Sequence, residues 1–332
     1  GAAIGTSHMF NIFLTILFTF IIFSIGFFIR YIIDPVGINN KFDIGLRKDV
    51  ALAYRTQKFV ELNKIQPNTI ILGGSRVHYL NTKDIEKYTQ DKVYNLGLQF
   101  GTLEEQYYFL KHSLENFSIN NVLIGLNFYT FDENLKENSS DFNKAIFEKG
   151  FNTFYQIKHY LEIPLFKYLK YVIPNNDRNL FYENGAITLY HQEQVIKNND
   201  KSYMWESNLE HYRKTYQNYN VIGNSNLEYY KKIVELCKEY NINLKVFTTA
   251  VHSSQLKLIE ETNTLDLFDI WKNEIASIFP FWDFMTENSV TSNEDNYIDS
   301  SHIKQEFGYL YFAKIFEDFD IEIPEDFGIF IE

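Results

Sequence analysis

The beginning of the chain is a long apolar run with almost no polar interruption. From Met9 to Phe28 there is no charged residue, and Phe, Ile and Leu dominate. An uncharged apolar run of about 20 residues is long enough to cross a bilayer as a helix. A buried core helix is the alternative, but soluble helices usually carry a polar face. We therefore expect a membrane anchor over residues 9–33, preceded by a cloning remnant at residues 1–8.

The residues after this run bear on whether the anchor is retained. Arg30 is followed by Asp34-Pro35, which should end the helix, and there is no small-x-small cleavage site. We interpret the run as an uncleaved anchor. No basic residue precedes Arg30 within residues 9–29, so the positive-inside rule weakly opposes an outward-facing C-terminal part.

Beyond Pro35, short apolar runs alternate with amphipathic stretches. Runs of this length that stop at Gly or at small polar residues are typical of buried strands. We expect strands at residues 69–73, 92–97, 121–127 and 243–250, and helices at residues 48–65, 106–114, 225–240, 255–277 and 303–316. The alternation predicts βαβ units and an α/β domain with a parallel sheet over residues 34–332.

The alternation stops between about residues 132 and 224. Aromatic and basic segments there, such as residues 154–160 and 166–172, predict a mostly helical insertion over the active edge of the sheet. The simplest interpretation is that these aromatic residues form the insertion's own core. The alternatives are a lid, a glycan platform or a contact with a membrane partner.

Charge and motif content exclude several function classes. The chain has 43 acidic and 31 basic residues and a net charge of −12. That balance argues against nucleic-acid binding and against a broad polybasic membrane patch. Cys237 is the single cysteine, so no internal disulfide forms, and we expect it in a helix core. There is no HExxH motif and no other zinc pattern. We expect neither a metal nor an organic cofactor.

Candidate chemistry lies at the end of the first expected strand and near the C-terminus. Ser75 follows Gly73-Gly74, at the strand end where open α/β sheets bind ligands. Asp299 precedes His302 by three residues. Such a carboxylate can hold one imidazole N–H while the other ring nitrogen takes a proton from a serine hydroxyl. Each part alone has a simple alternative, because Ser75 and Asp299 could both be helix caps. Together they form a candidate triad.

Acyl transfer also needs donors for the developing oxyanion. Three candidates lie one per successive strand end: the backbone N–H groups of Ser75 and Gly97 and the side-chain amide of Asn127. Gly97 could instead be a turn glycine, and Asn127 a helix cap.

These blocks resemble the four conserved blocks of the SGNH (GDSL-like) hydrolase superfamily. The phrases Leu72–Tyr79 (LGGSRVHY), Tyr94–Gly97 (YNLG), Val122–Tyr129 (VLIGLNFY) and Asn296–His302 (NYIDSSH) are most similar to its membrane-anchored, extracytoplasmic branch. That branch includes DltD and the alginate and peptidoglycan O-acetylation proteins. The resemblance covers roughly residues 66–130 and 225–318. It departs from the GDSL form at Gly74, which stands where that form has Asp.

The resemblance implies a flavodoxin-like three-layer parallel sheet with an outward-facing catalytic domain. It implies that Ser75 is the nucleophile, His302 the base and Asp299 its orienting group, with Gly97 and Asn127 in the oxyanion hole. Two further residues are possible substrate contacts. Arg76 could bind an anionic substrate group, although bracing of the turn is favoured, and His252 could line the site or be a solvated loop residue.

We therefore expect a membrane-anchored serine acyltransferase or esterase that handles O-acyl groups, acetyl groups by resemblance, on a cell-surface glycan. By the same resemblance, the acyl donor comes from a membrane-bound O-acyltransferase partner. The alternatives are a glycan O-deacetylase, and an inactive SGNH-like binding module of a membrane complex.

Overall fold

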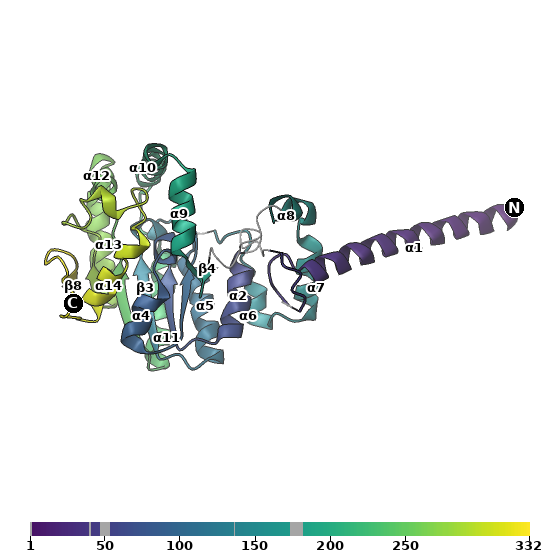
Figure 1. The fold of residues 1–332 in the computed structure, drawn as a ribbon, viewed down its shortest axis with the longest axis horizontal. Coiled ribbons are helices and arrows are strands. Elements are labelled where there is room, and N and C mark those ends of the chain that lie inside the picture. The colour runs from purple at the N-terminus through teal and green to yellow at the C-terminus, as the bar shows by residue number, and fades with distance from the viewer. Residues whose placement is uncertain (1, 40, 47–53, 136, 173–181) are drawn as a thin grey trace. The chain divides into compact units, whose positions relative to one another are not determined.

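The computed structural model describes residues 2–39, 41–46, 54–135, 137–172 and 182–332. The chain is a mixed α/β protein that forms two compact units (Figure 1). Unit 1 comprises Gly1–Val60 and Ala145–Arg178, and unit 2 comprises Glu61–Lys144 and Asn179–Glu332. The segment expected to be one insertion is thus divided between the two units.

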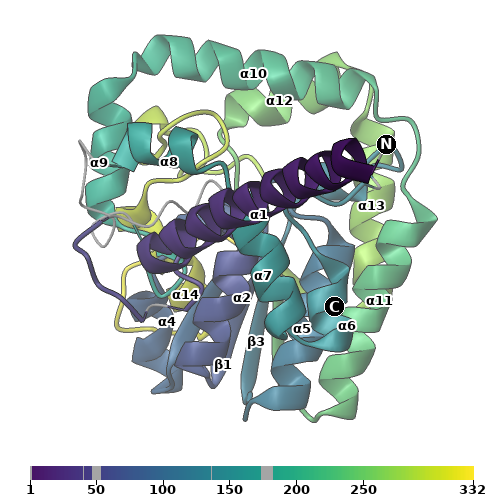
Figure 2. The ribbon, with the colours of Figure 1, turned by 90° about the vertical axis from the view of Figure 1, so that its right-hand side faces the viewer.

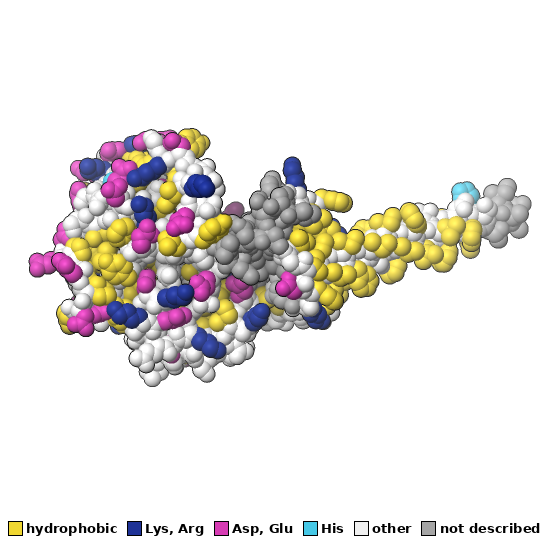
Figure 3. Space-filling model, in the orientation of Figure 1, with side chains coloured by type: hydrophobic (Ala, Val, Ile, Leu, Met, Phe, Trp, Pro, Cys, Tyr) yellow, Lys and Arg dark blue, Asp and Glu magenta, His cyan; other side chains and the backbone are white. Residues whose placement is uncertain are grey.

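Unit 1 contains the N-terminal apolar helix. Within α1 (Ala2–Ile33), the segment Ser7–Ile33 is long and apolar enough to cross a membrane, with a mean hydropathy of 2.7. Hydrophobic side chains cover most of its visible surface (Figure 3). The helix ends directly before Asp34-Pro35, as the sequence predicts. Two shorter helices, α7 (Thr153–Glu162) and α8 (Leu165–Val172), complete the regular structure that lies entirely in this unit.

Unit 2 is built on a six-stranded sheet with the order β2-β1-β3-β6-β7-β8. The strands are β1 (Thr69–Gly73), β2 (Val93–Gly97), β3 (Asn121–Leu126), β6 (Asn243–Thr248), β7 (Phe281–Asp283) and β8 (Ile329–Ile331). The first five are parallel, and β8 pairs antiparallel with β7. The five parallel strands have the order 2-1-3-4-5, as in flavodoxin-like sheets. The sheet is therefore mostly parallel, rather than wholly parallel as expected.

Helices cover both faces of this sheet (Figure 2). On one face α4 (Thr82–Thr89) packs with α14 (Tyr309–Ile315), and on the other α11 (Asn224–Glu239) packs with α5 (Leu103–Asn116) and α13 (Leu265–Ile278). Because both faces are covered, every residue of β1 is buried, which explains its uninterrupted apolar run. The strand order reverses between β1 and β3, so ligands are expected at their carboxyl ends.

The remaining elements connect these layers. They are α2 (Tyr54–Ile65), α3 (Ser75–His78), η2 (Phe128–Phe131), α6 (Lys144–Lys149), β4 (Tyr182–Glu183), β5 (Ala186–Ile187), α9 (Leu189–Asn198), α10 (Lys201–Gln217), α12 (Ser253–Glu261), η4 (Glu294–Asn296) and η5 (Gln305–Phe307). Cys237 lies buried in α11, as expected.

Two of the expected helices differ clearly from the prediction. The helix expected over residues 255–277 is two helices, α12 and α13. Hydroxyl groups of Thr262 and Thr264 bind the last carbonyls of α12, and Asn263 between them has a left-handed φ of 58°. The final helix, α14, begins only at Tyr309. The described part of the first expected helix is α2; residues 48–53 lie outside the described residues.

Four strands were not predicted. β7 and β8 are three residues long, too short to show a period of two. β4 and β5 form a hairpin within the segment expected to lack strands. Their turn, Asn184-Gly185, has positive φ at both residues (46° and 79°). Asn-Gly is the dipeptide most typical of a two-residue hairpin turn, and it was present in the sequence.

Candidate active site

Ser75 lies where the sequence places it, just beyond the carboxyl end of β1. Gly74 is the N-cap of α3, and Ser75 is the first residue of that helix. Ser75 is therefore not the helix cap, so that alternative is wrong. Its side chain is partly exposed, whereas the residues around it are buried. Its backbone N–H is one of the first-turn amides that have no acceptor within the helix.

The structure brings Ser75, His302 and Asp299 into one hydrogen-bonded chain. His302 Nε2 lies 3.0 Å from Ser75 Oγ. His302 Nδ1 lies 2.9 Å from each carboxylate oxygen of Asp299. If Nδ1 carries the proton and donates to the carboxylate, Nε2 is an acceptor that faces the serine hydroxyl. This is the geometry in which an imidazole can take the serine proton.

The backbone around Asp299 fixes its carboxylate. Asp299 Oδ1 accepts hydrogen bonds from the backbone N–H groups of Ser301 at 2.8 Å and His302 at 2.9 Å. This is a local turn and not a helix cap, because no helix begins until η5 at Gln305. Burial by itself would raise the pKa of this carboxyl. The charge and hydrogen bond of His302, with the two backbone donors, outweigh it and hold the pKa below its ordinary value.

Aromatic residues support the imidazole and the turn after Ser75. The Tyr79 ring lies 5.1 Å from the His302 ring, at 45°. His78 is fully buried and stacks on Tyr182 at 5.6 Å. The His78 ring is therefore part of the packing around α3.

Asn127 follows β3 directly and is 1% exposed. It is the N-cap residue of η2, as the helix-cap alternative has it, but its side chain makes no capping hydrogen bond. Its Oδ1 accepts hydrogen bonds from the Thr249 hydroxyl and from Arg76 Nη1, the latter at 3.3 Å. The other end of the amide faces the turn before Ser75: a Cβ atom added to Gly74 would lie 2.6 Å from Nδ2.

Gly97 has a different role from the oxyanion donor that was expected. Its backbone N–H donates to Asn95 Oδ1 at 2.7 Å, so it is not free to bind an oxyanion. The structure therefore does not support the donor role expected for Gly97. Glycine is required there for space, because a Cβ atom would lie 2.5 Å from the backbone nitrogen of His78. The remaining candidate donors are the Ser75 N–H and Asn127 Nδ2.

Arg76 and His252, the two possible substrate contacts, both pack beside the site. Arg76 is 3% exposed, which leaves it little surface for a substrate and agrees with a bracing role. The backbone N–H of His252 donates to Ser300 O at 3.0 Å, and its ring packs edge-on against Trp205 and Tyr297. His252 is thus a partly buried loop residue that packs beside the Asp299–His302 segment, and its Nδ1 caps α12 by accepting from the Ser254 backbone N–H at 3.1 Å.

Two polar residues of the site were missed in the sequence. Thr249 follows β6, so the strand-end argument that singled out Ser75 and Asn127 applies to it as well. Gln255 lies on α12 and contacts Ser300 and Ser301. No sequence signal marks Gln255, because it reaches the site only through the packing of α12.

Phe100 lies in the loop after β2. It is 70% exposed and has a left-handed φ of 51°. A bulky residue rarely adopts this conformation, so the loop holds it under strain.

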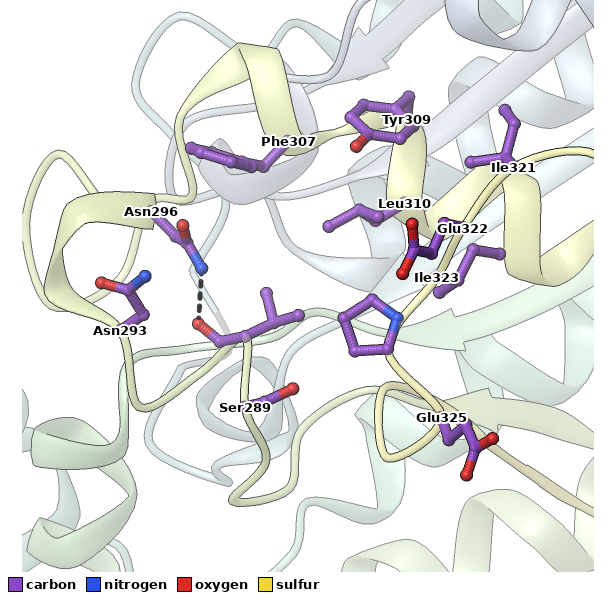
Figure 4. Close-up of a pocket in the computed structure, with 12 residues that line it drawn as sticks. Ser289, Asn293, Asn296, Phe307, Tyr309, Leu310, Ile321, Glu322, Ile323 and Glu325 are labelled. Carbon is purple, nitrogen blue, oxygen red and sulfur yellow. Dashed lines mark hydrogen bonds between the residues drawn. The ribbon is translucent and has the colours of Figure 1, made fainter.

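The described residues contain no candidate metal site, and a large open pocket near the C-terminus is lined by other residues. No group of three or more His, Cys, Asp or Glu among the described residues could hold a metal ion. An open pocket of about 820 Å³ lies between the Ser289–Asn296 segment, the start of α14 and residues 321–325 (Figure 4). None of the candidate site residues lines it.

Comparisons with known proteins give limited matches. No family model matches the chain, and no curated protein matches it. Among solved structures, a candidate platelet activating factor from Streptococcus pneumonia is 12% identical, with 81% of this chain and 93% of that chain covered and a TM-score of 0.37. A candidate acylhydrolase from Bacteroides fragilis NCTC 9343 is 14% identical, with 79% and 93% covered and a TM-score of 0.32. A likeness at these scores is too weak to assign a function to this chain.

Proposed function

We propose that the chain is a serine esterase or acyltransferase with Ser75 as its nucleophile. The observation that supports this most directly is the chain of hydrogen bonds from Ser75 Oγ through His302 to Asp299. It stands at the carboxyl ends of parallel strands, beside an amide nitrogen of Asn127. Nucleophile, base, orienting carboxylate and oxyanion donor are the parts that acyl transfer needs.

In the first half-reaction, Ser75 Oγ attacks the carbonyl carbon of an ester while His302 Nε2 takes the hydroxyl proton. The electron pair of the C=O bond moves to oxygen, where the Ser75 N–H and Asn127 Nδ2 stabilise it. Collapse of this intermediate breaks the bond to the leaving oxygen, which receives the proton from Nε2. The products are an acylated Ser75 and an alcohol. Asp299 stays ionised and stabilises the imidazolium, which agrees with its lowered pKa.

In the second half-reaction, an acceptor hydroxyl gives its proton to His302 Nε2 and attacks the acyl carbon, which forms a second tetrahedral intermediate. Its collapse breaks the bond between the acyl carbon and Ser75 Oγ, and Oγ takes the proton back from Nε2. With a sugar hydroxyl as acceptor the protein is a transferase. With water as acceptor it is a deacylase. Both outcomes use the same residues, and they differ in whether water is excluded from the acyl-enzyme.

We further propose that the substrate is an O-acylated, and specifically O-acetylated, cell-surface glycan, and that a membrane-bound O-acyltransferase supplies the acyl group. The sequence resemblance supports this choice. A retained anchor is supported by α1, whose last turn contacts other parts of unit 1: Arg30 Nε donates to Ile163 O at 3.0 Å, and Tyr160 Oη donates to Asp34, just after the helix, at 3.0 Å. The catalytic part would lie on the extracytoplasmic side.

The test is hydrolysis of a chromogenic acetyl ester by the full chain in detergent. We expect Ser75→Ala to lower turnover to the uncatalysed level, because it removes the nucleophile. Ser277→Ala is the matched control, since Ser277 is an exposed serine whose hydroxyl donates to Glu274 O within α13. Equal turnover by the Ser75→Ala protein and the unaltered protein would refute the serine mechanism. Acetylation of the cell-surface glycan in cells that carry His302→Ala tests the glycan assignment, and unchanged acetylation would contradict it.

A further inference from the structure

Arg76, the residue after the candidate nucleophile, carries a buried charge without a carboxylate partner. Its side chain is 3% exposed, and among the described residues no Asp or Glu forms an ion pair with it. The rings of Tyr129 and Tyr212 lie 5.4 and 5.2 Å from the guanidinium carbon. Burial of an ion without a counter-ion is costly, so the remaining contacts of Arg76 must compensate.

One side of the guanidinium contacts Asn127. Arg76 Nη1 lies 3.3 Å from Asn127 Oδ1 and 3.4 Å from the hydroxyl oxygen of Thr249. A guanidinium has donors and no acceptor, so only the oxygen end of an amide can face it. This contact therefore determines which way the Asn127 amide is turned. Its NH₂ group must face Gly74 and Ser75, where the oxyanion forms.

The other side of the guanidinium contacts Gln255 by the same chemistry. With its oxygen toward Arg76, the Gln255 amide accepts from Arg76 Nη2 at 2.8 Å and from the Tyr216 hydroxyl at 3.1 Å. Its nitrogen then donates to Ser300 O at 3.1 Å and to the Ser301 hydroxyl. Ser300 and Ser301 are the two residues between Asp299 and His302. Arg76 is thus linked through one side chain to the segment that carries the base.

We propose that Arg76 is a positioning residue that aligns the oxyanion donor and the base with Ser75. It turns the Asn127 amide toward the oxyanion, and through Gln255 it holds the Asp299–His302 segment. Because no counter-ion neutralises it, its charge also polarises the Asn127 amide in the direction that stabilises an oxyanion. This inference rests on the proposed acyl transfer at Ser75.

The experiment measures kcat and KM of the full-length Arg76→Ala protein with a chromogenic acetyl ester, with and without added guanidinium. We expect kcat to fall about 100-fold, the usual cost of losing an oxyanion donor, with KM little changed. Millimolar guanidinium should restore part of kcat, whereas the same concentration of ammonium should not. Arg213→Ala is the matched control, because Arg213 pairs with Glu261 at the surface and its loss should change neither parameter.

The outcomes separate this inference from the proposed function. If the unaltered protein shows no turnover that depends on Ser75, both the proposed function and the role of Arg76 are refuted. Normal turnover together with an Arg76→Ala kcat within threefold of it, or a kcat loss that guanidinium does not reverse, would overturn the role of Arg76 alone. If Arg76→Ala does not fold, Arg76→Lys decides. A lysine cannot reach both amides with one planar group, so kcat should still fall at an unchanged melting temperature, and full activity would overturn the proposal.

A second inference comes from unit 1, where α7 exposes an apolar stripe beside the end of α1. Phe154, Ile157 and Leu161 are 67%, 43% and 49% exposed and are spaced by three and four residues, so they share one face of the helix. Phe166, in α8, is 86% exposed. Lys158, between these residues along α7, has a side chain that is 53% exposed. Apolar side chains with adjacent lysines are typical of helices that lie in a membrane interface.

The contacts of α7 with α1 place this stripe next to the point where the apolar helix ends. The Tyr160 ring packs edge-on against Phe27 at 6.0 Å and against Tyr31 at 5.6 Å. Arg30 Nε donates to Ile163 O, directly after α7. A segment fixed to the last turns of a membrane-spanning helix lies at the depth of the lipid headgroups. We infer that the stripe of Phe154, Ile157 and Leu161 lies in the headgroup region of the bilayer that α1 crosses.

The test uses the full chain in lipid nanodiscs, with an environment-sensitive fluorophore on Leu161→Cys and, separately, on Phe319→Cys. Phe319 is 93% exposed in unit 2 and serves as the matched control. Spin-labelled lipids should quench the probe at residue 161 several-fold more strongly than the probe at residue 319. Equal quenching at the two positions would overturn the inference. That result is also the one expected if another protein, and not lipid, covers the stripe.

Discussion

A single methyl group at Gly74 should disable the oxyanion site without touching the nucleophile or the base. The backbone at Gly74 has φ −88° and ψ −159°, an extended conformation that alanine adopts readily. What Gly74→Ala changes is space. The new Cβ would lie 2.6 Å from Asn127 Nδ2 and 3.3 Å from the Tyr129 hydroxyl. The amide nitrogen must therefore move away, because Cβ atoms essentially never lie within 3.0 Å of such an atom.

The Asn127 amide has little freedom to retreat, because Thr249 and Arg76 bind its other end. Overpacking of this kind costs about 1–3 kcal/mol of folding free energy. We expect the larger effect on catalysis, since a displaced oxyanion donor lowers kcat by about 100- to 1,000-fold. KM for a small acetyl ester should change little, because the donor acts mainly on the transition state.

The assay is a double-mutant cycle with Gly74→Ala and Asn127→Ala, in which kcat and the melting temperature are measured for all four proteins. If the methyl group acts through Asn127, it should have almost no further effect on kcat once Asn127 is alanine. An equal loss of kcat in both backgrounds would refute this reasoning, and so would a Gly74→Ala protein with nearly unaltered kcat. The melting temperatures show whether a lost kcat reflects unfolding.

Three further predictions concern titratable groups. Asp299→Asn should lower kcat by at least about 100-fold, because the neutral amide no longer stabilises the imidazolium of His302; a pH–rate profile within tenfold of the unaltered protein would contradict this. Burial raises the pKa of Asp84 to about 6, so this carboxyl favours the folded state below its unfolded pKa of 3.8 and loses that contribution as the pH rises through about 6. Asp84→Asn should therefore stabilise the protein by up to about 1 kcal/mol at pH 8, allowing for its partial exposure, and should not stabilise it at pH 4. Denaturant titration at the two pH values measures this change in the free energy of unfolding. Equal effects at both pH values would show the reasoning wrong. Burial raises the pKa of Cys237 to about 12, so a thiol reagent should modify it only on unfolding, and rapid labelling of the native chain would place it at the surface instead.

The proximity of Ser75 and His302 could be predicted from the sequence because the position of each segment follows a simple rule. Parallel strands end at one edge of the sheet, which places Ser75 and Asn127 together. Asp299 and His302 are close enough along the chain for one turn to join them. What the rules could not supply was the distance of 3.0 Å between residues 227 positions apart, which depends on the packing of α14 and of the segment before it.

Other features required the fold itself. The side chain of Asn95 reaches back to the Gly97 N–H, and no motif reveals that this donor is occupied. The burial of Arg76 depends on α10 and α12, which contribute Tyr212 and Gln255 from distant parts of the sequence. β7 and β8 are strands only because neighbouring strands pair with them. The Asn184-Gly185 turn is different, because the sequence contained its signal.

Covalent labelling of the nucleophile tests the central claim most directly. The full chain would be treated with a fluorophosphonate, which reacts with activated serines, and the modified residue identified by peptide mass spectrometry. An activated Ser75 predicts one adduct, on Ser75, with loss of ester hydrolysis in proportion to labelling and much slower labelling of the His302→Ala protein. Hydrolysis that persists after complete labelling of Ser75, or a Ser75 that stays unmodified while the protein turns over substrate, would contradict the claim.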